Sequence, residues 1–476
     1  VSSLPIRARS VGVHKCNGAS SKDIFNMFLF ETAALFVVAL VCMALLLFAF
    51  REYVADMVAV PTLGTLLNAQ TIWLPAIMIL AIFILSALLP ARLFSVIPVT
   101  QVFRVSTSGK QGWKRSLLFI QFGGIAFVIT LLVIVLLQYD RLMNNDLGYD
   151  PENIVYAPLN NMDDQKAAKL TAEFKKLPYV TATGLSSMDI LSGYGGFPIL
   201  DNEKNWLFTA RQVNYDADYL SLMKIPLLEG QPLKGDGDIL VNESFVSKRG
   251  WTDAAIGKYI YDDEGNLKGK IVGVTRDFMV NSFFTPQLPV IMFGSDRMSY
   301  CNFTVRVSEL TPEYLREMND KIAELFPNED VGFTVLKTII ESQYEGTRHF
   351  RDGVFVASIA ILLITLMGLL GYITDEMHRR SKEIAIRKVN GATAPNILRL
   401  LSKDVLITAF PAILLGVIAS RVVGESWLRQ FADKIPLTVF IFISTALLVL
   451  AIIWGCVILK SWNIANENPV RSIKNE

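Results

Sequence analysis

The segment RRSKEIAIRKVNGATAPNILRLLSKD (residues 379–404) decides the fold, because a second version, RARSVGVHKCNGASSKDIFNMFLFE, occupies residues 7–31. Each version is basic, then reads Asn-Gly-Ala, then Ser or Thr, and leads into a long apolar run. Asn and Gly accept the left-handed conformation that ends a helix, and a following Ser or Thr caps the next one. Both versions therefore predict a short helix, a tight turn and a new, long helix.

The residues after the turn support this interpretation. In the later version Thr393 is the expected cap, and Pro395 fits the first turn of the following helix. In the earlier version Ser20 or Ser21 takes the cap, and Asp23 stands in the first turn, where a negative charge suits the helix dipole. The two long helices should begin at equivalent positions.

The composition is that of a membrane protein. The chain has 476 residues, of which 52% are hydrophobic. Spanning the hydrocarbon core takes roughly 20 apolar residues of helix. Six runs approach or exceed this length: Phe28–Phe50, Ile72–Leu89, Ser116–Leu137, Val354–Ile373, Val405–Val423 and Leu437–Leu459. We expect an α-helical membrane protein with six spans in this chain.

The distribution of charge sets the orientation. The net charge is only +1, but acidic residues outnumber basic ones between residues 140 and 351, whereas residues 1–23, 92–115, 375–404 and 460–476 are basic. Lys and Arg in short loops mark the cytoplasmic side. The long acidic segment should therefore lie outside the membrane. Its alternating strand-like and helix-like runs predict one inserted α+β domain on that outer side of the membrane.

The repeat divides the chain into units. We expect residues 1–104 to form the carboxyl-terminal part of a first unit and residues 105–138 a linker with an outgoing span. Residues 139–350 form the outer domain, and residues 351–476 a second unit that contains the basic segment 376–392. Since an outgoing span and an outer domain precede the second copy, the same parts are expected ahead of the first. The intact protein would then have eight spans, and this chain would be its carboxyl-terminal portion.

The chain offers no motif for chemistry of its own. Its four cysteines and three histidines are scattered and have no metal-ligand or disulfide spacing. No G-x-x-x-x-G-K-[ST] sequence occurs, so ATP hydrolysis is not expected in this chain. The sequence YDDEGN (residues 261–266) predicts a hairpin turn rather than a cation site. No catalytic residue, no metal site and no nucleic-acid partner is expected.

Two kinds of residue stand out within the spans. Glu31 and Asp404 occupy equivalent positions near the cytoplasmic ends of their helices. A charge at membrane depth is a functional candidate, but here pairing with cations of the basic segment, or solvation, is the expected role. Gly123-Gly124 and Pro411 predict close helix packing or a kink.

These motifs resemble a known family. The stretches RRSKEIAIRKVNGAT and RARSVGVHKCNGAS are similar to the coupling segment of FtsX-like ABC transporter permeases of the MacB type. VNYDADYLSLMKIPLLEGQPL (residues 213–233) and KIVGVTRDF (residues 270–278) are similar to the periplasmic core domain of that family. The resemblance implies that both basic segments dock an ATP-binding subunit, which would bind ATP and Mg. The residues implied are Glu383, Arg387, Lys388, Asn390 and Gly391, with Lys15, Asn17 and Gly18 in the first copy.

The first copy departs from the family pattern. Ser10 stands where the second copy has Glu383, and His14 where it has Arg387. These differences put in doubt whether the two segments bind their partner equally well.

The resemblance also implies a function. It predicts a permease subunit in a bacterial inner membrane that exports periplasmic molecules such as antimicrobial compounds or peptides, together with a periplasmic adaptor and an outer-membrane channel. Lipoprotein release and activation of cell-wall hydrolases are alternatives within related branches. From another class, a non-transporting sensor or scaffold remains open. Binding of an ATP-binding protein through the basic segments would discriminate the transporter from the sensor.

Overall fold

The structure is a computed structural model. It describes residues 13–57, 72–88, 91–92, 112–160, 163–191, 195–201, 203–251, 255–280, 284–294, 301–327 and 329–465. The chain forms two compact units, a helical unit and a sheet unit. The helical unit comprises residues 1–139, 346–427 and 436–476, and the sheet unit comprises residues 140–345 and 428–435.

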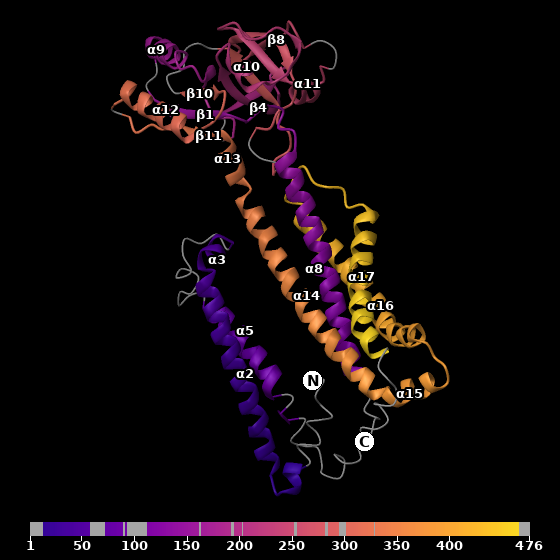
Figure 1. The fold of residues 1–476 in the computed structure, drawn as a ribbon. Coiled ribbons are helices and arrows are strands. Elements are labelled where there is room, and N and C mark those ends of the chain that lie inside the picture. Colours follow the sequence, from indigo (N-terminus) through magenta and orange to yellow (C-terminus); the bar gives the residue numbers. More distant parts are fainter. Residues whose placement is uncertain are drawn as a thin grey trace. The chain divides into compact units, whose positions relative to one another are not determined.

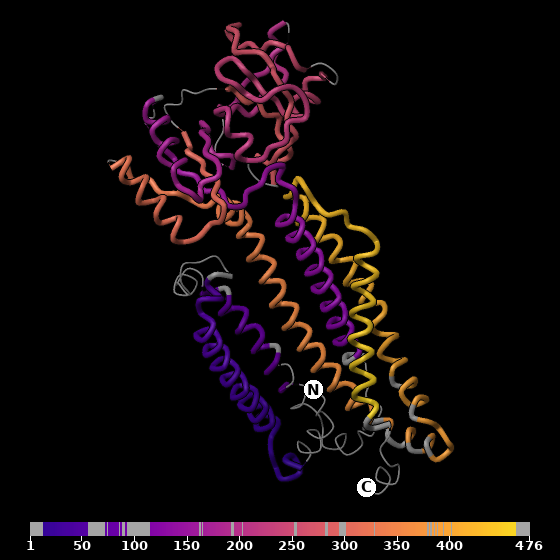
Figure 2. The backbone as a smooth tube through the Cα atoms, turned by 45° about the horizontal axis from the view of Figure 1, so that its top comes forward, coloured from indigo at the N-terminus to yellow at the C-terminus, as the bar shows by residue number. Residues whose placement is uncertain are grey.

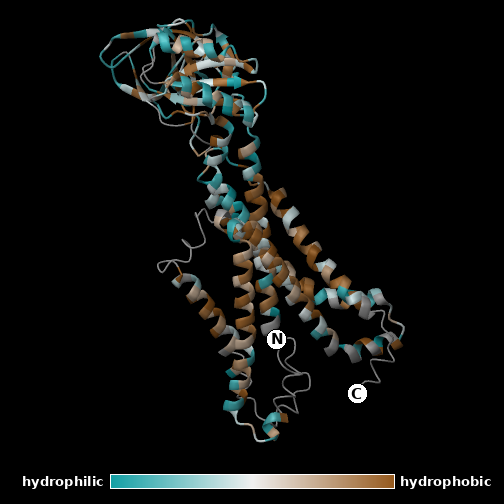
Figure 3. Cartoon of the chain, turned by 60° about the vertical axis from the view of Figure 1, so that its left-hand side comes forward, coloured by the Kyte–Doolittle hydropathy of each residue, from teal (hydrophilic) through white to brown (hydrophobic). Residues whose placement is uncertain are grey.

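Long apolar helices dominate the helical unit (Figure 1). They are α2 (Ser21–Ala49), α8 (Gly112–Asn144), α14 (Glu345–Arg379), α16 (Ala394–Leu428) and α17 (Val439–Ala465). Among the described residues these five helices are long and apolar enough to cross a membrane. The hydropathy colouring shows apolar residues along their length and a mixed pattern over the sheet unit (Figure 3).

The sixth expected span, Ile72–Leu89, is not confirmed. Its described part is α5 (Trp73–Phe83), which continues into a π-helical turn at Ile84–Leu88, and Leu89 lies outside the described residues. The 11 α-helical residues rise only about 16 Å at 1.5 Å per residue, against a hydrocarbon core of about 30 Å. Helix α3 (Arg51–Met57) follows α2.

Close packing holds α8 against α16. A methyl group built at Gly416 would lie 2.2 Å from the carbonyl oxygen of Gly123, so these two backbones touch. The Thr130 hydroxyl of α8 donates to the Thr445 hydroxyl of α17 over 3.1 Å in a buried position. Small residues permit such approach in membrane helices. The expectation of close packing is thus confirmed for Gly123, whereas Gly124 has nothing within 4 Å of its added methyl position.

The sheet unit is built on one mixed sheet, and Figure 2 follows the chain from α8 through this unit to α14. The strand order is β11-β1-β10-β2-β4-β9-β6-β8-β5, with β3 beside β4 and β7 beside β8. The strands are β1 (Ile154–Leu159), β2 (Val180–Ser186), β3 (Gly195–Leu200), β4 (Trp206–Tyr215), β5 (Leu227–Gly230), β6 (Asp238–Asn242), β7 (Tyr259–Tyr261), β8 (Leu267–Thr275), β9 (Val290–Gly294), β10 (Cys301–Val307) and β11 (Thr334–Val335). Pairs β4–β9 and β6–β8 are parallel. This confirms the α+β prediction.

Two apolar cores stabilise the sheet unit. The first packs α9 (Asp164–Phe174) and α12 (Pro312–Leu325) against β1, β2 and β10, with Phe174 and Phe303 at its centre. The second packs α11 (Glu243–Arg249) against β4, β6 and β9 around Phe245. Helices α10 (Tyr219–Met223) and α13 (Leu336–Gln343) complete the unit. The strands contribute alternate residues to these cores because successive side chains point to opposite faces.

Candidate functional site

The later basic segment forms a short helix, α15 (Ser381–Val389), directly after α14. The Arg380 amide donates to the Glu376 carbonyl, and the Ile384 amide donates to the Arg380 carbonyl over 2.8 Å. Hydrogen bonding is therefore almost continuous from α14 into α15. Ile384 is 6% exposed and anchors the helix against the protein, whereas Ile386 is 62% and Val389 71% exposed. The helix thus presents an apolar edge away from the unit that carries it.

The polar side of α15 carries an ion pair. Nη2 of Arg387 lies 2.7 Å from Oε1 of Glu383, one turn earlier, and both side chains are exposed. A Glu placed four residues before a cation on an exposed helix stabilises it by about 0.3–0.5 kcal/mol. The pair therefore orients the two side chains but contributes little to the stability of the fold. Of the other predicted residues in this helix, the side chain of Lys388 lies outside the described part of the chain.

The turn after α15 depends on Gly391. Its φ is +87°, in the left-handed region that favours glycine. The Ala392 amide donates to the Arg387 carbonyl over 2.9 Å, and the Asn390 amide donates to the Ile386 carbonyl over 3.1 Å. The bond from the residue after the glycine back over five residues is that of a Schellman turn, which satisfies the last carbonyls of a helix. Helix α16 begins two residues later.

The earlier basic segment repeats this geometry. Gly18 has a φ of +92°. The Ala19 amide donates to the His14 carbonyl over 3.0 Å, and the Asn17 amide donates to the Val13 carbonyl over 3.1 Å. Residues 13–16 are helical, so Lys15 lies in the last turn before Asn17. The predicted helix, turn and new helix are confirmed in both copies, although Ser10 lies outside the described residues.

The caps of the two following helices differ in detail. Ser20 and Asp23 form a reciprocal capping box at the start of α2, which confirms Ser20 as the cap. The Ser20 amide donates to Oδ2 of Asp23 over 2.9 Å. At the start of α16 the Thr393 carbonyl accepts the Asn396 amide over 3.0 Å. Both helices begin at equivalent positions, as the sequence predicts.

A cluster of charges ties α15 to its neighbours. Arg380 donates to Glu376 on α14 and to Asp404 on α16. Arg115 of α8 lies 3.8 Å from the same carboxylate of Asp404. Glu376 is only 4% exposed, and the Asp404 side chain is 25% exposed. Arg380 therefore connects three helices at the point where α15 begins.

Within this cluster, the prediction for the two charges near the membrane ends of their helices can be checked for Asp404. Asp404 pairs with a cation of the basic segment, as predicted, and the pair is partly buried. At the equivalent position in the first copy, the side chain of Glu31 is exposed. Sequence reasoning missed Glu376 and Arg115. The spacing of Glu376 four residues before Arg380 was a usable signal, but the approach of Arg115 across more than 280 residues of chain had none.

The described residues offer no cluster of side chains for a metal ion. No group of three or more His, Cys, Asp or Glu side chains in the described part of the chain could hold a metal ion. The stretch 261–266 is the predicted hairpin between β7 and β8. There the Asp262 amide donates to the Asn266 carbonyl over 3.0 Å, and Gly265 has a φ of +94°. The carboxylates of Asp262 and Glu264 accept hydrogen bonds from Asn266 within this turn.

The two copies of the repeat each match a known protein family. The family of FtsX-like permease C-terminal domains matches residues 3–99 and again residues 355–469. No curated protein matches the chain. Among solved structures, the periplasmic region of MacB from Actinobacillus actinomycetemcomitans is 13% identical, with a TM-score of 0.31, and the match covers 42% of this chain and 97% of that one. The extracellular domain of the ABC-type transporter YknZ from Gram-positive bacteria is 10% identical, with a TM-score of 0.27, and the match covers 38% and 98%.

Proposed function

We propose that this chain, in which residues 3–99 and 355–469 match the family of FtsX-like permease C-terminal domains, is the membrane subunit of an ABC transporter and docks a separate ATP-binding subunit through its two basic segments. ATP and Mg bind to that subunit. The observation that carries the proposal is the repetition of one helix-and-turn geometry, with Gly18 and Gly391 at the same place, in both segments that match the family.

The form of α15 suits a docking element. Its exposed residues Ile386 and Val389 are three positions apart and so lie on one side of the helix. The Glu383–Arg387 pair lies beside them. An apolar centre with a charged rim is the usual anatomy of a protein interface. In the first copy Val13 takes the place of Ile386 and is likewise exposed.

The charge cluster supports transmission of force from the docked subunit. Arg380 joins α15 to α14 and α16 through two charged hydrogen bonds. A displacement of α15 then moves α14, whose first residue, Glu345, is the last residue of the main segment of the sheet unit. Through this continuous helix, ATP hydrolysis in the cytoplasm moves the outer domain.

Orientation and substrate complete the proposal. The basic connections support a cytoplasmic position for the two docking segments and an outer position for the sheet unit, across a bacterial inner membrane. Movement of the outer domain then drives export of periplasmic molecules. An adaptor and an outer-membrane channel would be further partners in that process.

The test is a quantitative pull-down from native membranes in mild detergent, with the recovered proteins identified by mass spectrometry. We expect an ATP-binding subunit with a phosphate-binding loop in stoichiometric amounts. The double variant Glu383→Lys/Arg387→Glu keeps the local pair but reverses its polarity. It should recover far less of that subunit at an unchanged yield of folded chain.

Three outcomes would each contradict a part of the proposal. Absence of any ATP-binding protein with the wild-type chain would leave the sensor or scaffold as the better function. Equal recovery by wild type and the reversed-pair variant would remove α15 from the interface. A co-purifying cell-wall hydrolase would replace export by activation of that enzyme.

A further inference from the structure

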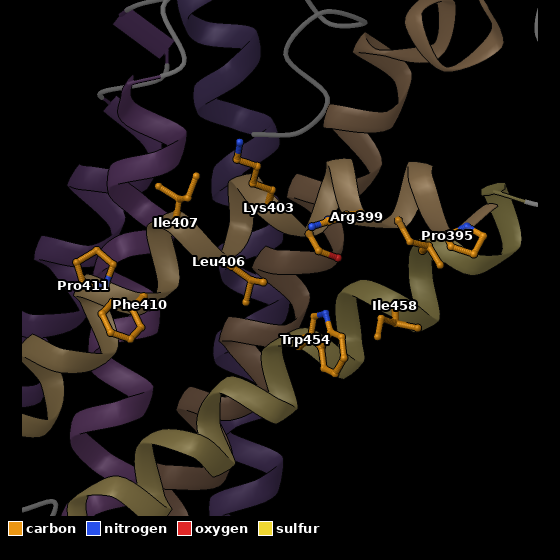
Figure 4. Close-up of a pocket in the computed structure, with 11 residues that line it drawn as sticks. Pro395, Arg399, Lys403, Leu406, Ile407, Phe410, Pro411, Trp454 and Ile458 are labelled. Atoms are coloured by element: carbon orange, nitrogen blue, oxygen red, sulfur yellow. The ribbon is translucent and has the colours of Figure 1, made fainter. Parts of the chain in front are cut away.

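A groove between α16 and α17 runs along the first half of α16. Its volume is about 1170 Å³. Its walls are apolar: Leu406, Ile407, Phe410, Pro411, Trp454 and Ile458. Figure 4 shows the side chains of α16 on one wall and those of Trp454 and Ile458 on the facing helix. A second apolar groove, lined by Leu414 and Leu447, shares Phe410 with the first.

The end of the groove nearest the docking segment is basic. Arg399 and Lys403 line it, are four residues apart on α16, and are both exposed. The buried residue Ser402 lines it beside them. Among the described residues, no carboxylate lines this groove. The groove therefore has two cations at one end and apolar walls along the rest of its length.

These cations lie in the first turns of a helix that is long and apolar enough to cross a membrane, and in the proposed orientation these turns are at its cytoplasmic end. Helix α16 begins at Ala394, so Arg399 and Lys403 lie about 7 and 13 Å along it at 1.5 Å per residue. Basic pockets between membrane helices on the cytoplasmic side bind anionic lipid headgroups. We propose that this groove binds one anionic phospholipid of the cytoplasmic leaflet, with its phosphate at Arg399 and Lys403 and its acyl chains along α16 and α17.

The site rests on the orientation given in the proposed function, and it extends that function to regulation by the membrane. Pro395, at the basic end of the groove, lies only four residues after Gly391. A lipid bound there packs against the first turns of α16, which follow the Schellman turn. Anionic lipid then holds the start of α16 in place and steadies the docking segment that leads into it.

The experiment uses the full chain, purified without any ATP-binding subunit and placed in nanodiscs of phosphatidylcholine with or without phosphatidylglycerol. Native mass spectrometry counts the lipids that remain bound on release. Thermal unfolding is followed in parallel. We expect one phosphatidylglycerol to be retained, with a rise in Tm that phosphatidylcholine does not give. Arg399→Gln/Lys403→Gln should weaken retention roughly thirtyfold, since each cation near an anionic membrane surface contributes a factor of about five.

The control is Lys22→Gln, which removes an exposed cation from the first turn of α2 and should retain the lipid as wild type does. An equal Tm of wild type and double variant in phosphatidylcholine shows that both are folded. Retention of phosphatidylcholine and phosphatidylglycerol to the same extent, or undiminished retention by the double variant, would overturn the site. So would an acylated peptide found bound in place of the lipid. Since no ATP-binding subunit is present, failure here leaves the docking proposal standing, and failure of docking leaves the lipid result standing.

Discussion

At the scale of single residues, the turn glycine carries a clear prediction. Nothing lies within 4 Å of a methyl group built on Gly391, so only its φ of +87° opposes a side chain. The left-handed conformation costs roughly 1–2 kcal/mol for an ordinary L-residue, and Asn tolerates it best. Gly391→Val should therefore misplace the docking segment and reduce recovery of the ATP-binding subunit several-fold, while Gly391→Asn should retain most of it. Equal recovery by the two variants would show that the turn geometry does not matter.

The charge cluster gives a second prediction at this scale. Glu376 is 4% exposed and has Arg380 as a partner. Removing one member of a buried pair costs about 3–5 kcal/mol, and less where water reaches the group. Arg380→Gln should lower the Tm of the full chain and weaken coupling between ATP hydrolysis and transport.

The matched control neutralises Arg380 together with both of its carboxylate partners and leaves the exposed Arg115 unchanged. In Glu376→Gln/Arg380→Gln/Asp404→Asn no buried charge is left without a counter-charge, so its Tm should recover most of the loss. A single Arg380→Gln variant as stable as wild type would exclude the cluster as a structural connection.

A third residue-scale prediction concerns pH. Burial raises the pKa of Asp216 to about 6, although its carboxylate accepts the amides of Leu185 and Tyr219 over 2.7 and 2.8 Å. An unfolded aspartate has a pKa near 3.9, so between about pH 4 and 6 the folded state binds more protons than the unfolded state. The free energy of unfolding of the sheet unit should fall as pH rises through this window. Denaturant titrations at several pH values should show this decrease in wild type and a smaller one in Asp216→Asn. The same pH slope in both proteins would refute the assignment.

At the scale of elements, the contact between α8 and α16 can be tested with two glycines. A methyl group at Gly416 would meet the carbonyl oxygen of Gly123 at 2.2 Å, and backbone cannot yield as a flexible side chain would. Gly416→Ala should force the helices apart and cost about 1–3 kcal/mol, measured as a lower Tm in detergent. Gly124→Ala is the control, because nothing lies within 4 Å of its added methyl group. A Tm for Gly416→Ala no lower than that of the control would contradict the packing.

How far each element could be predicted depends on the range of its interactions. The two Schellman turns and the capping box at Ser20 join residues at most five positions apart, so their sequence suffices. The strands β1, β8 and β10 follow from local pattern in the same way. The parallel pairing of β4 with β9 does not, because β5 to β8 intervene along the chain. The sixth expected span is not confirmed, because its described part comprises α5 and a short π-helical turn, with residues 89 and 90 outside the described residues.

At the scale of the whole molecule, the residues of the candidate site also fall into two groups: those brought together by local sequence and those brought together by packing of distant helices. Glu383, Arg387, Asn390 and Gly391 come together because they are neighbours in one helix and its turn. Arg115 joins Asp404 only through the packing of α8 beside α16. The groove between α16 and α17 likewise has no signature in either helix alone, since Arg399 and Trp454 line it from different helices.

The repeated turn has one more consequence, which concerns binding strength. Gly18 and Gly391 hold the same backbone shape, while His14 stands where the second copy has Arg387 and its ion pair. Both segments belong to one polypeptide, so in the proposed docking an ATP-binding partner with two copies, held by the second segment, would meet the first at a high effective concentration. Avidity would then compensate for a weaker first contact. The two copies thus share the backbone conformation of the turn but differ in the charge of the helix that precedes it.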